Sequence, residues 1–315
     1  MISVDDIREA ADRIRGRVRH TPIIAAVQLK TSLAKDAVVT LKLELLQVTG
    51  SFKARGATNK LMKTPPEVLA NGIVAASGGN HGLATARAGF MSAVPTWIYL
   101  PNNATPEKIA KLHQWGAETK IVGSTWHEAN SAALEHVEQT NAAYFHPFAD
   151  PDVVAGQGTV ALEIFEQVRQ VDTILVAMGG GGLISGVSTA AKAINPNVRI
   201  VGIEAAGCPV LLKSLEAGKN QALDQVTTSV ATMACALTDD KIFEIVRANV
   251  DEIVLVDDEE MQLAAEWLWF EMGLAADLSG AAAIAALMQD RISTRSGERI
   301  CAIVCGAGQE GIIHR

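Results

Sequence analysis

The sequence contains few cysteines and no long apolar run. None of the cysteines forms the C-x-x-C pair that is typical of structural zinc sites. The most apolar stretch, residues 273–288, is interrupted by Asp277 and is short for a membrane span. We therefore expect no metal site, no membrane partner and free thiols. The four cysteines are Cys208, Cys235, Cys301 and Cys305.

Positive charge is also scarce. The chain holds 27 lysines and arginines against 35 aspartates and glutamates, which gives a net charge of −8. This balance argues against nucleic acid as a partner, because a phosphate backbone attracts basic surfaces. The N-terminal segment is charged from Asp5 to Arg19 and does not resemble a signal peptide. We expect a cytoplasmic protein.

What the sequence does contain is an alternation of strand-like and helix-like segments. Apolar runs predict strands at residues 38–43, 73–76, 96–100, 120–122, 173–177, 198–203, 252–256 and 299–304. Periodic segments predict helices at residues 55–62, 81–90, 106–115, 126–140, 183–194, 259–272 and 279–289. A further helix is expected to begin at Ser3, with Asp6 completing a capping box, and to end at residues 20–22.

Such alternation predicts an α/β fold with mainly parallel sheets covered by helices. The chain of 315 residues, 49% of them hydrophobic, is long enough for two domains. Prolines at positions 65, 66, 147 and 151 mark two joints between them. We expect a small domain, residues 63–148, inserted in a larger domain formed by residues 1–62 and 149–315.

The segment at residues 49–57 (TGSFKARGA) places a lysine near the start of a predicted helix. Gly50 allows a sharp bend, and Ser51 is a candidate N-cap. The helix dipole does not favour a cation at this end, so it does not account for Lys53. Two interpretations remain: Lys53 is a surface residue, or its amine faces an electrophilic or anionic group. Phe52 is explained almost as well by core packing as by a ligand.

Four successive glycines lie between a predicted strand and a predicted helix. They are Gly179, Gly180, Gly181 and Gly182, followed by Leu183. Their amides and the positive end of the helix suit a phosphate group. Gly180, Gly182 and Glu204 also resemble a dinucleotide-binding unit, although Gly186 comes one residue late for G-x-G-x-x-G.

A second turn between a strand and a helix contains Ser77, Gly78, Gly79, Asn80 and His81. Its amides and the Ser77 hydroxyl suit a carboxylate. Taken alone, Asn80 is best explained as a helix cap and His81 as a polar residue at a helix start, outside the catalytic set. Taken alone, Cys305, at the end of the last strand, is explained as a small buried apolar residue, which is what a free cysteine usually is.

Five segments, in chain order, resemble motifs of the fold-type II pyridoxal-phosphate enzymes, in their serine/threonine dehydratase (threonine ammonia-lyase) branch. They are residues 49–57, 77–82, 155–159, 179–183 and 305–308. The resemblance implies a fold like that of the tryptophan synthase β subunit, with pyridoxal 5'-phosphate in a cleft between two domains. It also implies a homodimer.

The resemblance assigns roles to the residues of these motifs. The Lys53 amine would bond to the cofactor aldehyde and later move the Cα proton. Phe52 would lie beside the cofactor, Asn80 on its phenolic oxygen and Cys305 beside its ring nitrogen. Residues 179–183 would hold the phosphate. Residues 77–81 would hold the substrate carboxylate.

The activity implied is an ammonia-lyase that converts L-serine or L-threonine to a 2-oxo acid and ammonia. A thiol at Cys305 is a neutral partner for the ring nitrogen, which suits elimination better than transamination. Residues 229–233 depart from the family's usual sequence, so a racemase, or a dehydratase of hydroxyaspartate or phenylserine, is an alternative. Gly78 stands where similar serine racemases carry a proton-donating serine, which disfavours racemisation. A nucleotide-binding module that is not an enzyme is a third hypothesis.

The sequence departs from the family pattern in three further respects. The usual Glu-Pro-Ser-Gly-Ala is replaced by a segment that begins at Asp277. Val210 stands at the second acidic position of a cation site found in some relatives, which weakens ligation of a hard cation. Because the sequence ends at Arg315, no regulatory extension is expected.

Overall fold

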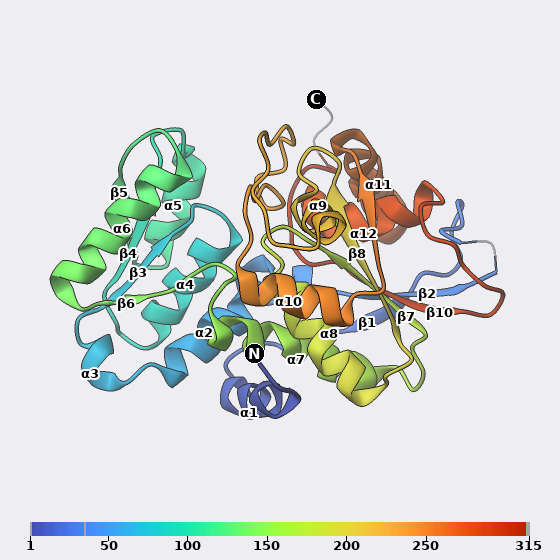
Figure 1. The fold of residues 1–315 in the computed structure, drawn as a ribbon, viewed down its shortest axis with the longest axis horizontal. Coiled ribbons are helices and arrows are strands. Elements are labelled where there is room, and N and C mark those ends of the chain that lie inside the picture. The colour runs from blue at the N-terminus through green and yellow to red at the C-terminus, as the bar shows by residue number, and fades with distance from the viewer. Residues whose placement is uncertain (1, 35, 313–315) are drawn as a thin grey trace.

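Two separate sheets organise the protein (Figure 1). The computed structural model describes residues 2–34 and 36–312. The extreme ends of the predicted large-domain range, residues 1 and 313–315, lie outside the described residues. The larger sheet has six strands and the smaller has four. The predicted α/β class with mainly parallel sheets is confirmed.

The six-stranded sheet has the order β1-β2-β10-β7-β8-β9. Only the β1–β2 pair within it is antiparallel. Its central strands are apolar and buried, as expected for parallel strands covered on both faces. The strands are β1 (Ile23–Ala25), β2 (Val38–Lys42), β7 (Thr173–Ala177), β8 (Arg199–Ala205), β9 (Glu252–Val256) and β10 (Arg299–Ile303).

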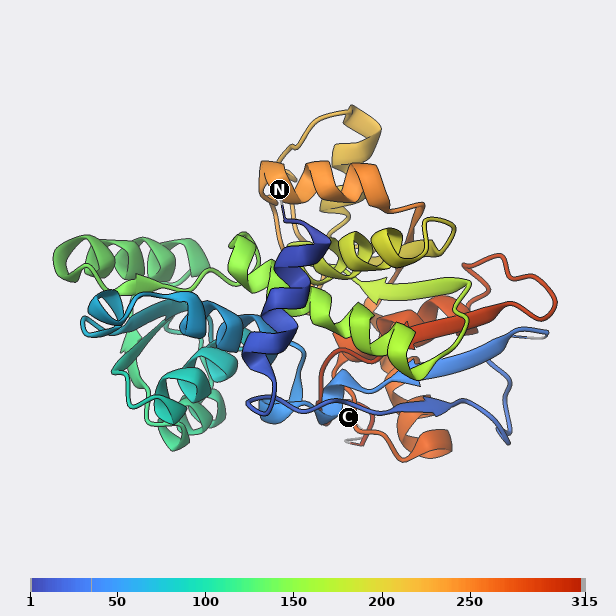
Figure 2. The same ribbon diagram turned by 90° about the horizontal axis from the view of Figure 1, so that it is seen from below.

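Helices cover this sheet. The almost fully buried α12 lies against β7, β8 and β9, while α7 packs on α8. Figure 2 shows α1 lying across α7. The helices are α1 (Val4–Ile14), α7 (Pro151–Gln167), α8 (Gly182–Ile194), α9 (Val210–Ala217), α10 (Asp240–Asn249), α11 (Asp258–Met272) and α12 (Leu278–Met288).

The first helix confirms its predicted beginning but not its predicted end. Ser3 and Asp6 form the capping box at its N-terminus. The helix ends at Ile14, well before residues 20–22, and Gly16 follows with a φ of +73° that breaks the helical path. Among the helices that cover the six-stranded sheet, α7, α9 and α10 are absent from the predicted set.

The four-stranded sheet has the order β5-β4-β3-β6, and all its neighbours are parallel. Alternate residues of β3 face different helices: Ile73 and Ala75 pack with α4, whereas Val74 and Ala76 pack with α6. The strands are β3 (Ile73–Ala76), β4 (Thr96–Leu100), β5 (Glu118–Ile121) and β6 (Ala143–Tyr144). The helices are α3 (Pro66–Leu69), α4 (Asn80–Met91), α5 (Pro106–Gln114) and α6 (Trp126–Thr140).

One helix, α2 (Lys53–Lys63), joins the two layers, because it packs against α4 on one side and α7 on the other. Gly56 and Gly156 allow the close approach of α2 to α7, since a Cβ on Gly156 would lie 2.6 Å from the Gly56 Cα. Two short 3-10 helices, Glu44–Leu46 and Val48–Gly50, precede α2. The N-terminus of α2 is thus held between the two sheets.

None of the helices formed by residues 2–34 and 36–312 has both the length and the apolar composition needed to cross a bilayer.

Candidate active site

The Lys53 amine points at the segment that leads from the small sheet back to the large one. Its Nζ donates a hydrogen bond of 2.6 Å to the Pro147 carbonyl, and it lies 5.2 Å from the centre of the Phe52 ring. Burial lowers the pKa of Lys53 to about 8, although the Cys305 and Cys235 thiols act in the opposite direction. The geometry therefore favours a directed amine over a solvated surface lysine.

Backbone pairing holds Lys53 beside the end of β10. The Phe52 amide donates to the Cys305 carbonyl at 3.2 Å, and the Ala307 amide donates to the Gly50 carbonyl at 2.8 Å. Gly50 has a φ of +80°, as its predicted bend requires. The prediction of Ser51 as N-cap is wrong. The helix begins two residues earlier than predicted, and the Ser51 hydroxyl is buried with no partner among the described residues.

The glycine run forms the turn from β7 into α8. A Cβ on Gly180 would overlap the Phe148 ring, and a Cβ on Gly181, whose φ is +84°, would crowd Ile242. Within the described chain, the amides of Gly180, Gly181 and Gly182 donate no hydrogen bond, and α8 has no side-chain cap. Leu183 is buried in the first turn of the helix. The site therefore offers free amide donors at a positive helix end.

The turn from β3 into α4 is built in a similar way. Its N-cap is Gly79, which makes no side-chain cap and has open space where a Cβ would stand. The Ser77 hydroxyl accepts a long hydrogen bond, 3.4 Å, from the Gly79 amide. Asn80 is the first helical residue, so its interpretation as an ordinary cap fails.

His81 is buried in the first turn of α4. Its Nε2 lies 2.8 Å from the Phe145 carbonyl, to which it donates, and its Nδ1 has no partner among the described residues. Burial lowers the pKa of His81 to about 3, and the nearby Lys53 lowers it further. The imidazole is therefore neutral, with an unused acceptor.

A series of side chains connects Asn80 to Cys305, the residues that the family resemblance assigns to the phenolic oxygen and the ring nitrogen of the cofactor. The Asn80 amide donates to Asp277 Oδ2 at 3.0 Å, and the Ser279 hydroxyl donates to Asp277 Oδ1 at 2.7 Å. The Cys305 thiol lies 3.8 Å from the Ser279 hydroxyl. Burial raises the pKa of the Cys305 thiol, and the Asp277 carboxylate raises it further, so the thiol stays protonated. Asp277 thus joins Asn80 to Cys305, although it is not among the residues predicted to bind cofactor or substrate.

A second group that the motifs do not include is the connecting segment, residues 145–148. Its carbonyls bond His81 and Lys53, and its Phe148 ring covers Gly180. The sequence predicts only a joint at Pro147. Its composition is a signal that could have identified this segment, because two phenylalanines and a histidine occur together in a chain with only 4% aromatic residues.

The residues that resemble a dinucleotide-binding unit take part in helix packing and helix capping. Gly186 lies within α8, where its Cβ position is 2.5 Å from the Gly158 amide of α7. Glu204 is buried and accepts hydrogen bonds from the amides of Leu211 and Leu212, at 2.8 and 2.9 Å. Burial raises the pKa of Glu204 to about 7, and those two amides oppose the shift. Gly186 therefore serves the contact between α7 and α8, and Glu204 caps the start of α9.

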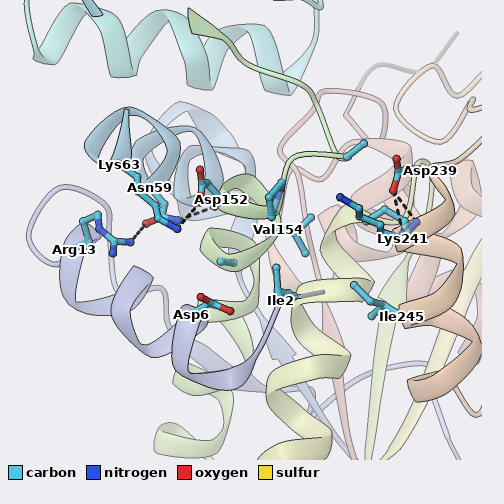
Figure 3. Close-up of a pocket in the computed structure, with 14 residues that line it drawn as sticks. Ile2, Asp6, Arg13, Asn59, Lys63, Asp152, Val154, Asp239, Lys241 and Ile245 are labelled. Atoms are coloured by element: carbon cyan, nitrogen blue, oxygen red, sulfur yellow. Dashed lines mark hydrogen bonds and ion pairs between the residues drawn. The ribbon is translucent and has the colours of Figure 1, made fainter. Parts of the chain in front are cut away.

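A separate pocket of about 260 Å³ opens between α1, α2, α7 and α10 (Figure 3). Figure 3 shows Arg13 and Asn59 on one side of it and Lys241 on the other. Arg13 donates to the Asn59 side chain at 2.6 Å. No residue predicted to bind cofactor or substrate lines the pocket, so it is distinct from the site around Lys53.

The residues around Lys53 fit pyridoxal phosphate. They provide an amine with a lowered pKa for the aldehyde, and free amides at an uncapped helix end for the phosphate. They also provide the Asn80 amide and the neutral Cys305 thiol, which are connected through Asp277 and Ser279. Lys53, at the N-terminus of α2, contacts Pro147, and Phe148 of the same segment lies against Gly180.

Comparison with known proteins agrees with this geometry. Residues 14–306 match the family described as pyridoxal-phosphate dependent enzyme. The chain is 38% identical over 300 residues to an L-threonine ammonia-lyase of Geobacter sulfurreducens, which covers 95% of this chain and 74% of that protein. It is 35% identical over 293 residues to a serine racemase of Oryza sativa subsp. indica, covering 93% and 86%.

Solved structures are similar over most of their length. Maize serine racemase superimposes with a TM-score of 0.92 at 33% identity, covering 97% of this chain and 93% of that chain. The processed threonine deaminase isoform 2 of Solanum lycopersicum gives 0.89 at 32% identity, covering 97% and 83%. The chain therefore belongs to the pyridoxal-phosphate-dependent enzymes of fold type II, in the serine/threonine dehydratase branch.

Proposed function

We propose that the protein is an ammonia-lyase that converts L-serine or L-threonine to a 2-oxo acid and ammonia. The observation that carries the proposal is the placement of the Lys53 amine between the connecting segment and Cys305. Similarity to an L-threonine ammonia-lyase over 95% of the chain supports it. We further propose that residues 63–148 close over the larger unit, residues 1–62 and 149–315, when substrate binds.

Pyridoxal phosphate, when bound, supplies a sink for the electrons left behind as the Cα–H bond breaks. Lys53 is suited to move that proton. Its pKa of about 8 means that the amine exists in both protonation states near neutral pH, where a general base is most effective. The Pro147 carbonyl orients the amine by accepting a hydrogen bond from it.

Other residues of the chain would bind the substrate and favour one reaction over another. The amides of Gly78, Gly79 and Asn80, with the Ser77 hydroxyl, would bind the substrate carboxylate at the start of α4, which has no side-chain cap. The Cys305 thiol remains neutral because burial raises its pKa. A neutral partner does not hold a ring nitrogen protonated, so loss of the β-hydroxyl is favoured over transamination.

The test is a substrate panel assayed for 2-oxo acid, with the visible colour of the protein as a second readout. Wild-type protein is expected to be yellow and to act on L-serine or L-threonine. Lys53→Ala should abolish both colour and product. Lys60→Ala, which removes an amine two turns along the same helix, should keep the colour. A colourless wild type that takes up no cofactor would overturn the proposal.

A racemase is the second candidate, because serine racemases of rice and maize are 35% and 33% identical to this chain. Position 78 argues against it. Glycine has no proton to donate, and a Cβ there would lie 3.0 Å from the Leu100 side chain. Accumulation of D-serine from L-serine would favour the racemase.

A bulkier hydroxy amino acid is the remaining alternative for the substrate. Residues 229–233 depart from the family, and the Thr232 carbonyl lies 2.8 Å from the Cβ position of Gly179. The same panel should therefore include hydroxyaspartate and phenylserine. For the assembly and location we propose a cytoplasmic homodimer, which sedimentation and cell fractionation would test.

A further inference from the structure

The connecting segment, residues 145–148, contacts three groups assigned to cofactor or substrate. The Phe145 carbonyl accepts a hydrogen bond from His81, and the Pro147 carbonyl accepts one from Lys53. The Phe148 ring fills the space beside Gly180. This short segment is therefore in contact with the amine, the imidazole and the glycine run at the same time.

His146 closes the turn within that segment. Its Nδ1 accepts hydrogen bonds from the Phe148 amide at 3.2 Å and from the Ala149 amide at 2.8 Å. Because both donors are N–H groups, Nδ1 must carry the lone pair and Nε2 the hydrogen. Burial lowers the pKa of His146 to about 4, and Lys53 lowers it further, so this neutral form persists near pH 7.

The imidazole is itself held in place from two sides. The Phe148 ring meets it edge-on, with centroids 4.7 Å apart, and the Tyr144 ring meets it at 6.0 Å. Proline has no amide hydrogen, so Pro147 cannot donate a bond that would close the turn. The His146 side chain closes the turn instead, by accepting hydrogen bonds from the Phe148 and Ala149 amides.

We propose that His146 is a positioning residue whose Nδ1 fixes the turn that aims the Pro147 carbonyl at Lys53 and holds the Phe148 ring against the glycine run. The inference rests on the proposed function, because it assigns a role in the same site. It also predicts which side chains can replace the imidazole. Asparagine places an oxygen acceptor near the position of Nδ1 and forms the same kind of turn, whereas leucine offers similar bulk with no acceptor.

The test compares His146→Asn with His146→Leu in the full-length protein. The first readout is hydrogen exchange at the Phe148 and Ala149 amides, which needs no cofactor. The second is the rate at which cofactor-free protein turns yellow with added pyridoxal phosphate. His113→Leu is the matched control, because that exposed ring bonds only Thr119 among the described residues.

We expect His146→Leu to exchange both amides about tenfold faster or more, and to turn yellow about tenfold more slowly, while His146→Asn stays within about threefold of wild type. Thermal denaturation should show that each variant is folded. Unchanged exchange in His146→Leu, or an asparagine variant as impaired as the leucine one, would overturn the inference. If wild type stays colourless, the proposed function fails, while hydrogen exchange still decides the role of His146 in the turn.

Discussion

Burial alters the pKa of Lys53 more than the neighbouring Cys305 and Cys235 thiols do. The pKa of its amine falls from 10.5 to about 8. Only the neutral amine attacks an aldehyde. We therefore predict that the rate of cofactor uptake by cofactor-free protein rises with pH around a midpoint of about 8, as stopped-flow absorbance would measure. A midpoint near 10.5 would contradict the buried environment.

The same shift affects stability in a defined direction. The folded protein binds fewer protons at Lys53 than the unfolded chain does between pH 8 and 10.5. The stability cost of burying this amine is therefore fully present below pH 8 and disappears as the pH rises to 10.5. Lys53→Met should remove that pH dependence, and denaturant unfolding across this range would measure the difference.

At the scale of single residues, the sequence predicts the site only where the signal is local. Lys53 and Asn80 stand in short motifs with recognisable spacing. Asp277 begins a segment that departs from the family pattern, and its contact with Asn80 has no local signal, because the two residues are 197 positions apart and the bond exists only after the two sheets meet. His146 also gives no motif signal, since its role depends on the backbone path of the turn that follows it.

Among the elements, the two glycine turns differ in what a side chain would meet. A Cβ on Gly180 would overlap the Phe148 ring, whereas a Cβ on Gly79 would meet open space. We predict that Gly180→Ala weakens cofactor binding by about tenfold or more, because the glycine turn must shift away from the phosphate. Gly79→Ala, which keeps its amide, should bind cofactor normally. Titration of cofactor-free protein with pyridoxal phosphate checks both, and equal affinities would contradict this account.

Buried charges hold the helix that carries Lys53. Arg55 bonds Glu44 on one side and Glu163 on the other, at 2.7 and 2.6 Å. Replacing it by methionine would leave the buried Glu44 and the partly buried Glu163 carboxylates with fewer partners. We predict that Arg55→Met destabilises the protein by about 3–5 kcal/mol in denaturant unfolding. Arg8→Met, which breaks an exposed pair, should cost about 1 kcal/mol or less.

The cluster also predicts how stability changes in acid. Burial raises the pKa of Glu163, but Arg55 and Lys42 more than offset this and hold it below the usual 4.5. Its contribution is present above pH 4.5 and is lost as the pH falls through the lowered pKa of the folded state. Arg55→Met should therefore lose less stability than wild type on acidification. An identical acid transition in the two proteins would show that the pair does not stabilise the fold.

Elements with strong apolar patterns were predictable, and those defined by helix contacts were not. The bounds of β3, β4, β7, β9 and α6 match their predictions. The missed helix α7 contains Gly156 and Gly158, which lower helix propensity. The structure uses them where α7 touches α2 and α8, since a Cβ at either position would crowd a neighbouring backbone. Such close contacts have no signature within a single segment.

For the whole molecule, the sequence predicts two joints but not the contacts that set one sheet against the other. The Asn80–Asp277 hydrogen bond is one such contact, because it connects the start of α4 with the start of α12. A carboxylate can only accept, so Asp277 selects the N–H side of the Asn80 amide. This orientation leaves the second N–H hydrogen available to a ligand such as the phenolic oxygen of the cofactor.

Exchanging the two residues separates their structural role from their role toward the cofactor. Asn80→Asp alone sets two carboxylates against each other and should destabilise the protein by about 2–3 kcal/mol. Adding Asp277→Asn restores a hydrogen bond with donor and acceptor reversed, and asparagine still caps α12. We predict that the double variant regains stability in denaturant unfolding but not cofactor affinity, since a carboxylate at position 80 has no hydrogen to donate to the cofactor. Recovery of both properties would show that the donor at this position is dispensable, whereas recovery of neither would show that the bond between the sheets does not form.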